Sequence, residues 1–160
     1  MATITATLEA AHGNGSIGRN PYMVQTTVDL TKNSINPNGD VVQCLTIPAH
    51  TKIMAAGMQV MTSATMNSGT NATAILGTGA DDNEYVEPAF DIDGAADGAY
   101  APCAAVAGDL IISTADTLDL TLTGGGSSFT AGSIRVWAML MDVSDMGDMT
   151  ADIVVRDMLA

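Results

Sequence analysis

The chain has 160 residues, enough for one domain that buries roughly two-thirds of its unfolded surface. Its 18 Asp and Glu residues outnumber its 5 Lys and Arg residues, giving a formal net charge of −13. A chain this acidic repels phosphate backbones and anionic lipid, so we expect neither nucleic acid nor membrane among its partners.

Residues 1–15 contain no cation ahead of an apolar stretch, which argues against a secretory signal and for synthesis in the cytoplasm. No apolar run approaches membrane-spanning length. Cys44 and Cys103 share no metal-ligand spacing. We expect free, buried thiols at both positions, with a single disulfide formed after release as the alternative.

Residues 1–21 are interpreted as an N-terminal arm. Ile4 and Leu8 are followed by the run HGNGSIGRNP, which cannot form a regular element. The run contains a G-x-G-x-x-G match, but Pro21 leaves no room for the helix that a dinucleotide site needs. It also contains a near match to the G-x-S-x-G nucleophile elbow around Ser16, without the required strand and helix.

Alternating or β-branched residues predict a series of strands after the arm. These cover residues 22–30, 41–47, 52–64, 72–77 and 110–113. Asn36-Pro37-Asn38-Gly39 is the strongest turn signal and suits a hairpin turn. Gly57 interrupts the third strand, where we expect a bulge or a close approach of another group.

Residues 81–98 are acidic and interrupted by Pro and Gly, which predicts a long loop with one short strand near Tyr85 or Phe90. Asp91, Asp93 and Asp97 have the close spacing of a calcium-binding loop. The EF-hand pattern fails at two later positions. We therefore favour a solvated acidic loop, with a calcium site as the alternative.

Residues 117–143 are predicted to form a β-hairpin. Leu118, Leu120 and Leu122 alternate with polar residues, and a Gly- and Ser-rich connection leads to a second strand at residues 133–143. That second strand is apolar on both faces. A strand of this kind is either central in a sandwich or covered by another subunit.

The second face of that strand carries Trp137, Met139 and Met141, which we take as candidates for a trimer interface. Met54, Met58 and Met61 also fall in a predicted strand. Core filling is the ordinary interpretation of methionines in such places, and an adaptable subunit interface is the alternative.

About eight short strands at near-regular spacing predict an all-β fold: a β-sandwich of jelly-roll type over residues 22–160, preceded by the extended arm. Residues 144–160 are interpreted as a terminal strand, although their methionines also fit helical spacing. His12 and His50 lie in no nucleophile pattern. We expect no enzyme activity, no catalytic residue, no cofactor and no metal.

Four features together resemble the head decoration, or cement, proteins of tailed bacteriophages. They are the Gly-rich arm, the segment IPAHTKIMAAGMQVMT, the acidic GTGADDNEY and the late TADTLDLTLTGGGSSFTAGSIRVWAMLMDV. The resemblance implies a β-sandwich that trimerises on the exterior of the virion, bridges major capsid protein subunits and stabilises the DNA-filled head.

On this interpretation the arm contacts the capsid through Ile4 and Leu8, with Arg19 pairing a capsid carboxylate. A tail or fibre accessory protein and a carbohydrate-binding β-sandwich are the competing classes. Sugar sites usually offer aromatic platforms, and the chain has 1 Trp, 3 Tyr and 2 Phe. Fibre modules more often show sequence repeats, which are not evident here.

Overall fold

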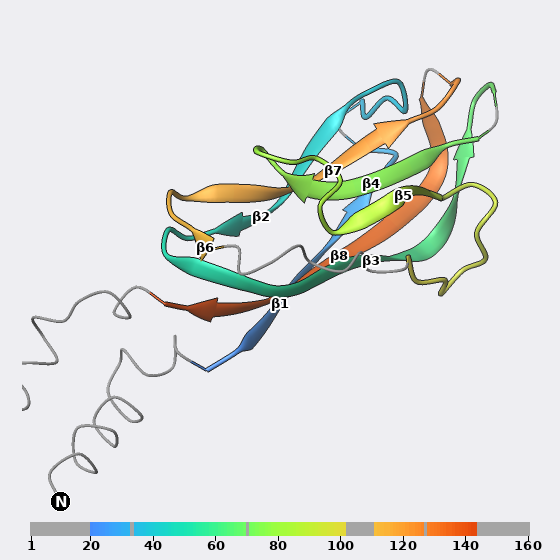
Figure 1. Ribbon diagram of the computed structural model, residues 1–160. Helices are drawn as coiled ribbons and strands as arrows, with labels where there is room; N and C mark the ends of the chain where they lie inside the picture. The colour runs from blue at the N-terminus through green and yellow to red at the C-terminus, as the bar shows by residue number, and fades with distance from the viewer. Residues whose placement is uncertain (1–19, 33, 70, 102–110, 127, 144–160) are drawn as a thin grey trace, which may run out of the picture.

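The computed structural model describes residues 20–32, 34–69, 71–101, 111–126 and 128–143. This part of the chain folds as a β-sandwich without helices (Figure 1). Its strands are β1 (Tyr22–Asp29), β2 (Val41–Ile47), β3 (Thr51–Met66), β4 (Thr73–Thr78), β5 (Val86–Asp91), β6 (Ile111–Ile112), β7 (Asp116–Thr123) and β8 (Phe129–Asp142). The described residues include no helix long and apolar enough to cross a membrane.

The strands form two four-stranded sheets, ordered β1-β8-β3-β6 and β2-β7-β4-β5. Every pair of neighbours is antiparallel. The pairs β1–β8, β2–β7, β3–β6 and β4–β5 are those of one long hairpin with its tip between β4 and β5. Rolling that hairpin into two layers gives the jelly roll, which confirms the predicted fold class.

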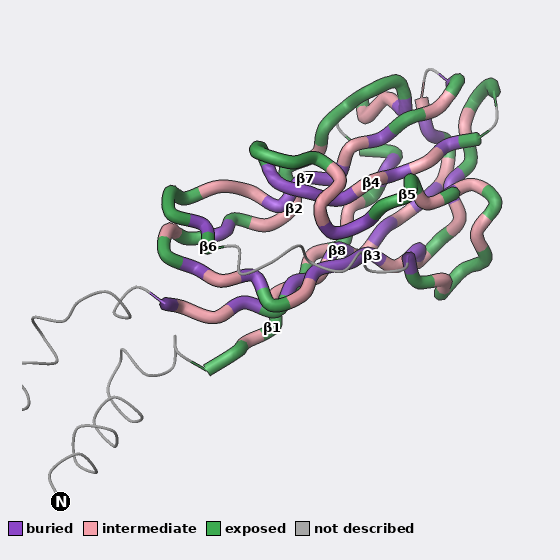
Figure 2. The backbone as a smooth tube through the Cα atoms, in the orientation of Figure 1, coloured by how far each residue is buried: buried purple, intermediate pink, exposed green. Residues whose placement is uncertain are grey.

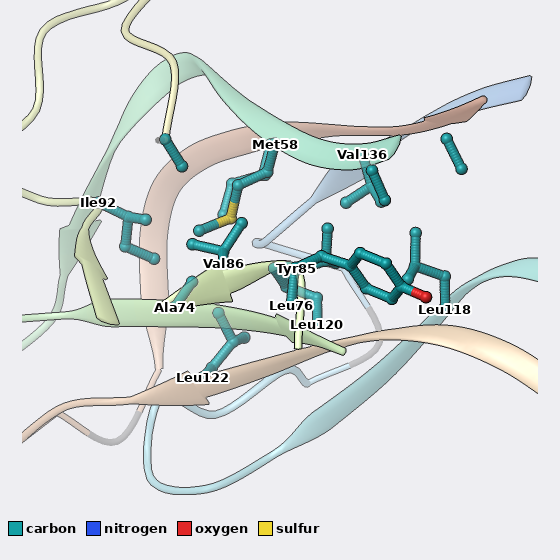
Figure 3. Packing of buried hydrophobic residues seen from close by; sticks show 14 of the residues in the cluster. Met58, Ala74, Leu76, Tyr85, Val86, Ile92, Leu118, Leu120, Leu122 and Val136 are labelled. Carbon is teal, nitrogen blue, oxygen red and sulfur yellow. The ribbon is translucent and has the colours of Figure 1, made fainter. Parts of the chain in front are cut away.

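The core lies between the two sheets, where the period-two pattern of each strand points one side chain in every two inward. Leu76, Leu120 and Leu122 of one sheet face Met58 and Val136 of the other (Figure 3). All five side chains are fully buried. This apolar layer is what holds the sheets together.

The predicted hairpin over residues 117–143 is wrong. β7 pairs with β2 and β4 in one sheet, whereas β8 pairs with β1 and β3 in the other. The Gly-rich connection crosses between the layers and packs closely, since a Cβ at Gly126 would lie 2.5 Å from the Ser68 carbonyl oxygen. β8 also begins at Phe129, earlier than residue 133.

The turn at residues 36–39 is confirmed, but it likewise joins strands of different sheets and closes no hairpin. Gly39 has a φ of 91°, which favours glycine, and its N–H donates to the carbonyl oxygen of Leu122 over 2.9 Å. β2 has the predicted bounds, and the short strand expected in the acidic segment is β5.

The close approach expected at Gly57 is confirmed. Trp137 of β8 lies opposite it, and a Cβ on Gly57 would lie 2.8 Å from the Trp137 ring. The nearest bulge is not at Gly57 but between Ile53 and Ala55. The terminal strand expected after residue 143 and almost all of the arm, residues 1–19, lie outside the described residues.

Candidate functional site

The outer face of the β1-β8-β3-β6 sheet carries the main candidate surface. β8 buries Val136, Ala138 and Leu140 against the core and turns Trp137, Met139 and Met141 to the opposite side. Met139 remains 38% exposed and the other two are half-buried. The predicted interface residues therefore share one face of a central strand.

Strand register adds apolar residues from the other three strands to this surface. Met23 of β1 lies opposite Met139 and is 61% exposed, while Met54 projects from the bulge of β3 and is 41% exposed. Ile111 of β6 lies opposite Lys52, which also pairs with Met141. We call this set the methionine face: Met23, Met54, Ile111, Trp137, Met139 and Met141.

Two of the methionines in β3 lie in different environments. Met54 belongs to the surface, whereas Met58 is fully buried in the core. Met23 and Ile111 were not singled out from the sequence, because the register across strands brings them to this face. Exposed apolar side chains thus gather on this face, with Lys52 between Met141 and Ile111 at its β6 end, and such a gathering is typical of an interaction site.

The same face becomes polar toward the other end of the sheet. Arg135 lies two residues before Trp137 and donates from Nη1 to Gln59 Oε1 over 3.4 Å. Lys52 lies beside Met141 at the apolar end. Arg135 and Lys52, two of the 5 Lys and Arg residues of this acidic chain, therefore lie on strands of the same sheet.

The three carboxylates of the acidic loop point to different parts of the backbone. Asp91 Oδ1 accepts from the Gly94 N–H over 2.8 Å, and this bond is the largest cause lowering the pKa of Asp91. Asp93 Oδ2 accepts from the Asn71 N–H over 2.8 Å, and Asp97 Oδ1 from the Ser63 N–H over 2.7 Å.

The Asp97 bond attaches the loop to β3, and the Asp93 bond attaches it to Asn71, just before β4, while the Asp91 bond stays within the loop. Among the described residues, no group of three or more His, Cys, Asp or Glu side chains is placed to hold a metal ion. The geometry assigns the three carboxylates to backbone capping, and the choice between a solvated loop and a calcium site stays a prediction for experiment.

The remaining candidates are spread over the chain. Ile4, Leu8 and Arg19 lie outside the described residues, as do the glycine and serine motifs of the arm. His50 occupies the turn between β2 and β3, where its N–H donates to the Ile112 carbonyl oxygen over 2.6 Å. His50 therefore takes part in this turn through its backbone.

Cys44 lies on β2 at a register shift, half-buried, and its Sγ donates to the Val42 carbonyl oxygen over 3.2 Å. Burial raises the pKa of the Cys44 thiol to about 12, and the nearby Asp119 carboxylate adds to the rise. A thiol with this pKa is protonated at neutral pH and a poor nucleophile.

No protein-family model matches the chain, and no curated protein matches it either. Among solved structures, a chain of the cyanophage Pam1 capsid asymmetric unit is similar, with a TM-score of 0.56 and 16% sequence identity. That match covers 81% of this chain and 87% of the other. At this identity the similarity shows a shared fold.

A second similar chain comes from the acidic stable capsid structure of the Helicobacter pylori bacteriophage KHP30. Its TM-score is 0.47 and its sequence identity is 10%, over 74% of this chain and 86% of the other.

Proposed function

We propose that this protein is a structural component of a bacteriophage virion, a decoration protein that binds the outer surface of the major capsid lattice and stabilises the DNA-filled head. The methionine face carries the proposal, because a small acidic jelly roll whose described residues leave an apolar sheet face exposed is suited to contact with other protein. The shared fold with a chain of the Pam1 capsid asymmetric unit, matched over most of both chains, supports it.

The methionine face is proposed to join three copies into a homotrimer, with Trp137, Met139 and Met141 at its centre. Methionine side chains adapt their shape to a neighbour, and Trp137 supplies a large rigid surface. The net charge of −13 disfavours close packing of copies through their acidic loops. The sheet face, which holds few acidic residues, is the surface through which copies can approach.

The arm is proposed to contact the major capsid protein. Ile4 and Leu8 provide apolar anchors, and Arg19 provides a cation in a chain that has 5 in all. An arm that orders on a neighbouring surface offsets its lost entropy by burying such anchors there. A basic capsid surface would complement the charge of the acidic domain. Nucleic acid and membrane have no place in this function.

The test is to purify DNA-filled particles and count this protein against the major capsid protein by quantitative mass spectrometry. A copy number comparable to that of the capsid lattice is expected. Recovery with tails at a few copies per particle would instead indicate a tail accessory protein, and absence from particles would refute a virion role.

Deletion of residues 2–18 tests the arm. The variant should keep its oligomeric state and melting curve, while its affinity for capsids that lack the protein falls at least tenfold, about 1.4 kcal/mol. An unchanged capsid affinity, or a collapse of the domain itself, would contradict the role assigned to the arm.

A further inference from the structure

β1 forms one edge of its sheet, and half of its backbone groups have no partner among the residues that the structure describes. The Leu30 N–H donates to the Gly132 carbonyl oxygen over 3.0 Å, continuing the register in which Val28 faces Ile134. In an antiparallel pair such bonded positions recur at every second residue. The even-numbered residues of β1 therefore bond to β8, and the odd-numbered ones point away from it.

Three odd-numbered residues, Met23, Gln25 and Thr27, thus present an N–H and a carbonyl oxygen each at the free edge. No hydrogen bond of the described chain reaches these backbone groups. The next odd position, Asp29, is already part of a turn, since its carbonyl oxygen accepts from the Lys32 N–H. The open ladder is long enough for one short strand.

The other sheet edges are protected against such pairing. Along β3, beyond the two-residue β6, the Val60 N–H donates to the Ala99 carbonyl oxygen and the Ala101 N–H to the Met58 carbonyl oxygen. β5 carries Pro88 in its middle. β2 has a register shift at Cys44. Proline, bulges and covering segments are the usual devices that block an edge.

β1 has none of these devices. Its register with β8 is unbroken from Tyr22 to Asp29, and the strand contains no Pro and no Lys. An edge of this kind is a template for another strand. Such an open edge in a natural protein is therefore expected to have an occupant.

The core is also incomplete beside this edge. Tyr22, Val24 and Val28 of β1 pack against the core but remain half-buried, whereas Val136 and Ala138 on the neighbouring β8 are fully buried. Figure 2 shows β1 in the exposed and intermediate colours along its length. A further strand beside β1 would remove this apolar surface from water.

We propose that residues 151–156 of this same chain, ADIVVR, add as a strand to the free edge of β1. The chain leaves β8 at Val143, whose N–H donates to the His50 carbonyl oxygen. The start of β1 lies at that end of the sheet, because Tyr22 pairs with Leu140. A returning segment would run opposite to β8 and parallel to β1.

The available length and chemistry fit this assignment. Residues 144–150 can span roughly 23 Å when extended, and crossing from β8 over β1 requires about 10 Å. The run Ile153-Val154-Val155 has the β-branched composition of a strand and is apolar on both faces. One face would cover the half-buried residues of β1, and the other would lie beside Met23.

Hydrogen exchange of single amides tests the proposal in the full-length protein. In the native chain the Gln25 and Thr27 amides should be protected, although no described partner accounts for it. Separate Ile153→Pro and Val154→Pro variants remove neighbouring N–H groups, one of which must face β1. At least one variant should speed exchange at Gln25 and Thr27 about tenfold or more.

Two controls report on the fold and the position. The Val24 and Thr26 amides bond to β8 and should keep their slow exchange in every variant. A Thr150→Pro variant, just before the proposed strand, should leave Gln25 and Thr27 protected. Fast exchange of these two amides in the native chain, or protection unaffected by both proline variants, would overturn the proposal.

Other occupants give other results. Protection that disappears on deletion of residues 2–18, but not in the proline variants, would assign the edge to the arm. Protection that depends on protein concentration would assign it to a neighbouring copy. Either result overturns the assignment to residues 151–156. Since no capsid is present, the outcome is separate from that of the capsid-binding experiments.

Discussion

Trp137 of β8 contacts β3 at Gly57. This contact explains why position 57 is a glycine and how position 137 can be a tryptophan. The absent side chain at Gly57 leaves the space that the indole ring occupies, since a Cβ there would be 2.8 Å from Cζ2 of the ring. The glycine weakens the strand by its own propensity. In return, a large aromatic side chain packs against the backbone of β3 at Gly57 and is half-buried without a partner subunit.

A Gly57→Val variant should displace Trp137 from this position and destabilise the protein by about 1–2 kcal/mol through overpacking. Because Trp137 is the single tryptophan of the chain, its emission should shift to longer wavelength as the ring becomes more exposed. Denaturant unfolding and fluorescence measure the two effects. Thr62→Val, an exposed position on the same strand, is the matched control and should change neither.

The Cys44 thiol provides a prediction about pH. Burial raises the pKa of the Cys44 thiol from its ordinary value to about 12, so between these two values the folded state holds a proton that the unfolded state releases. The unfolding free energy contributed by Cys44 is fully present below about pH 9 and is lost between about pH 9 and 12.

In a Cys103→Ser background, iodoacetamide at pH 8.5 should modify native Cys44 at least about tenfold more slowly than the unfolded chain. Asp119→Asn should speed the native reaction, because removal of the carboxylate charge lowers the pKa of Cys44. Equal rates in the native and unfolded chains would show that the Cys44 thiol is accessible and that its pKa is not raised.

At the scale of elements, the acidic loop acts as a cover for β3 that is fastened by its own carboxylates. Asp97 accepts from the Ser63 N–H, and the Ser63 hydroxyl donates to the Asp93 carbonyl oxygen over 3.0 Å. The loop backbone then follows β3, where the Gly98 N–H donates to the Val60 carbonyl oxygen over 2.7 Å. The acidic residues of this loop therefore accept backbone hydrogen bonds as well as contribute to the negative charge of the chain.

Asp97→Ala should therefore loosen the loop and lower the unfolding free energy by about 1 kcal/mol, the usual value of one such hydrogen bond. Amide exchange at Ser63 should become faster. Glu87→Ala, an exposed acidic position on β5, is the control for lost charge and should leave Ser63 unchanged. An equal response to both substitutions would mean that net charge, not the hydrogen bond, is responsible.

Addition of EDTA and then Ca²⁺ checks the loop independently. Carboxylates that cap backbone N–H groups need no cation, so the melting temperature should not change. A fall of several degrees with EDTA that Ca²⁺ reverses would identify a cation bound by the folded state.

At the scale of the whole molecule, the two outer sheet faces differ. One is the methionine face, which extends over all four strands of its sheet. The other carries the polar Gln43 and Thr121 together with a single strongly exposed large apolar residue among those described, Val41. This asymmetry points to the methionine face as the surface on which the assembly of copies depends.

Met139→Lys should dissociate the proposed trimer, because the change leaves a charge in a contact that excludes water. We expect the dissociation constant to rise at least about a hundredfold. Light scattering over a concentration series measures the change. Gln43→Lys, exposed on the opposite sheet, should keep the native mass. A monomeric native protein, or a trimer that survives Met139→Lys, would exclude this face as the interface.

The sequence by itself determined where most strands lie, which side of each strand is buried, and where turns separate them. Strand β2 was predicted to the residue, and the close approach at Gly57 and the shared face of Trp137, Met139 and Met141 were predicted correctly. These properties are local. Side-chain alternation and turn chemistry depend only on residues a few positions apart.

The tertiary structure decided which strands pair. Residues 117–143 have the same alternation whether the chain folds back within one sheet or crosses to the other, so the predicted hairpin failed. The same is true of the place of Met23 and Ile111 on the methionine face, and of the Asp93 and Asp97 bonds to Asn71 and Ser63. Each depends on strand register. Register follows from closing two apolar sheet faces over one another, which no local stretch of sequence encodes.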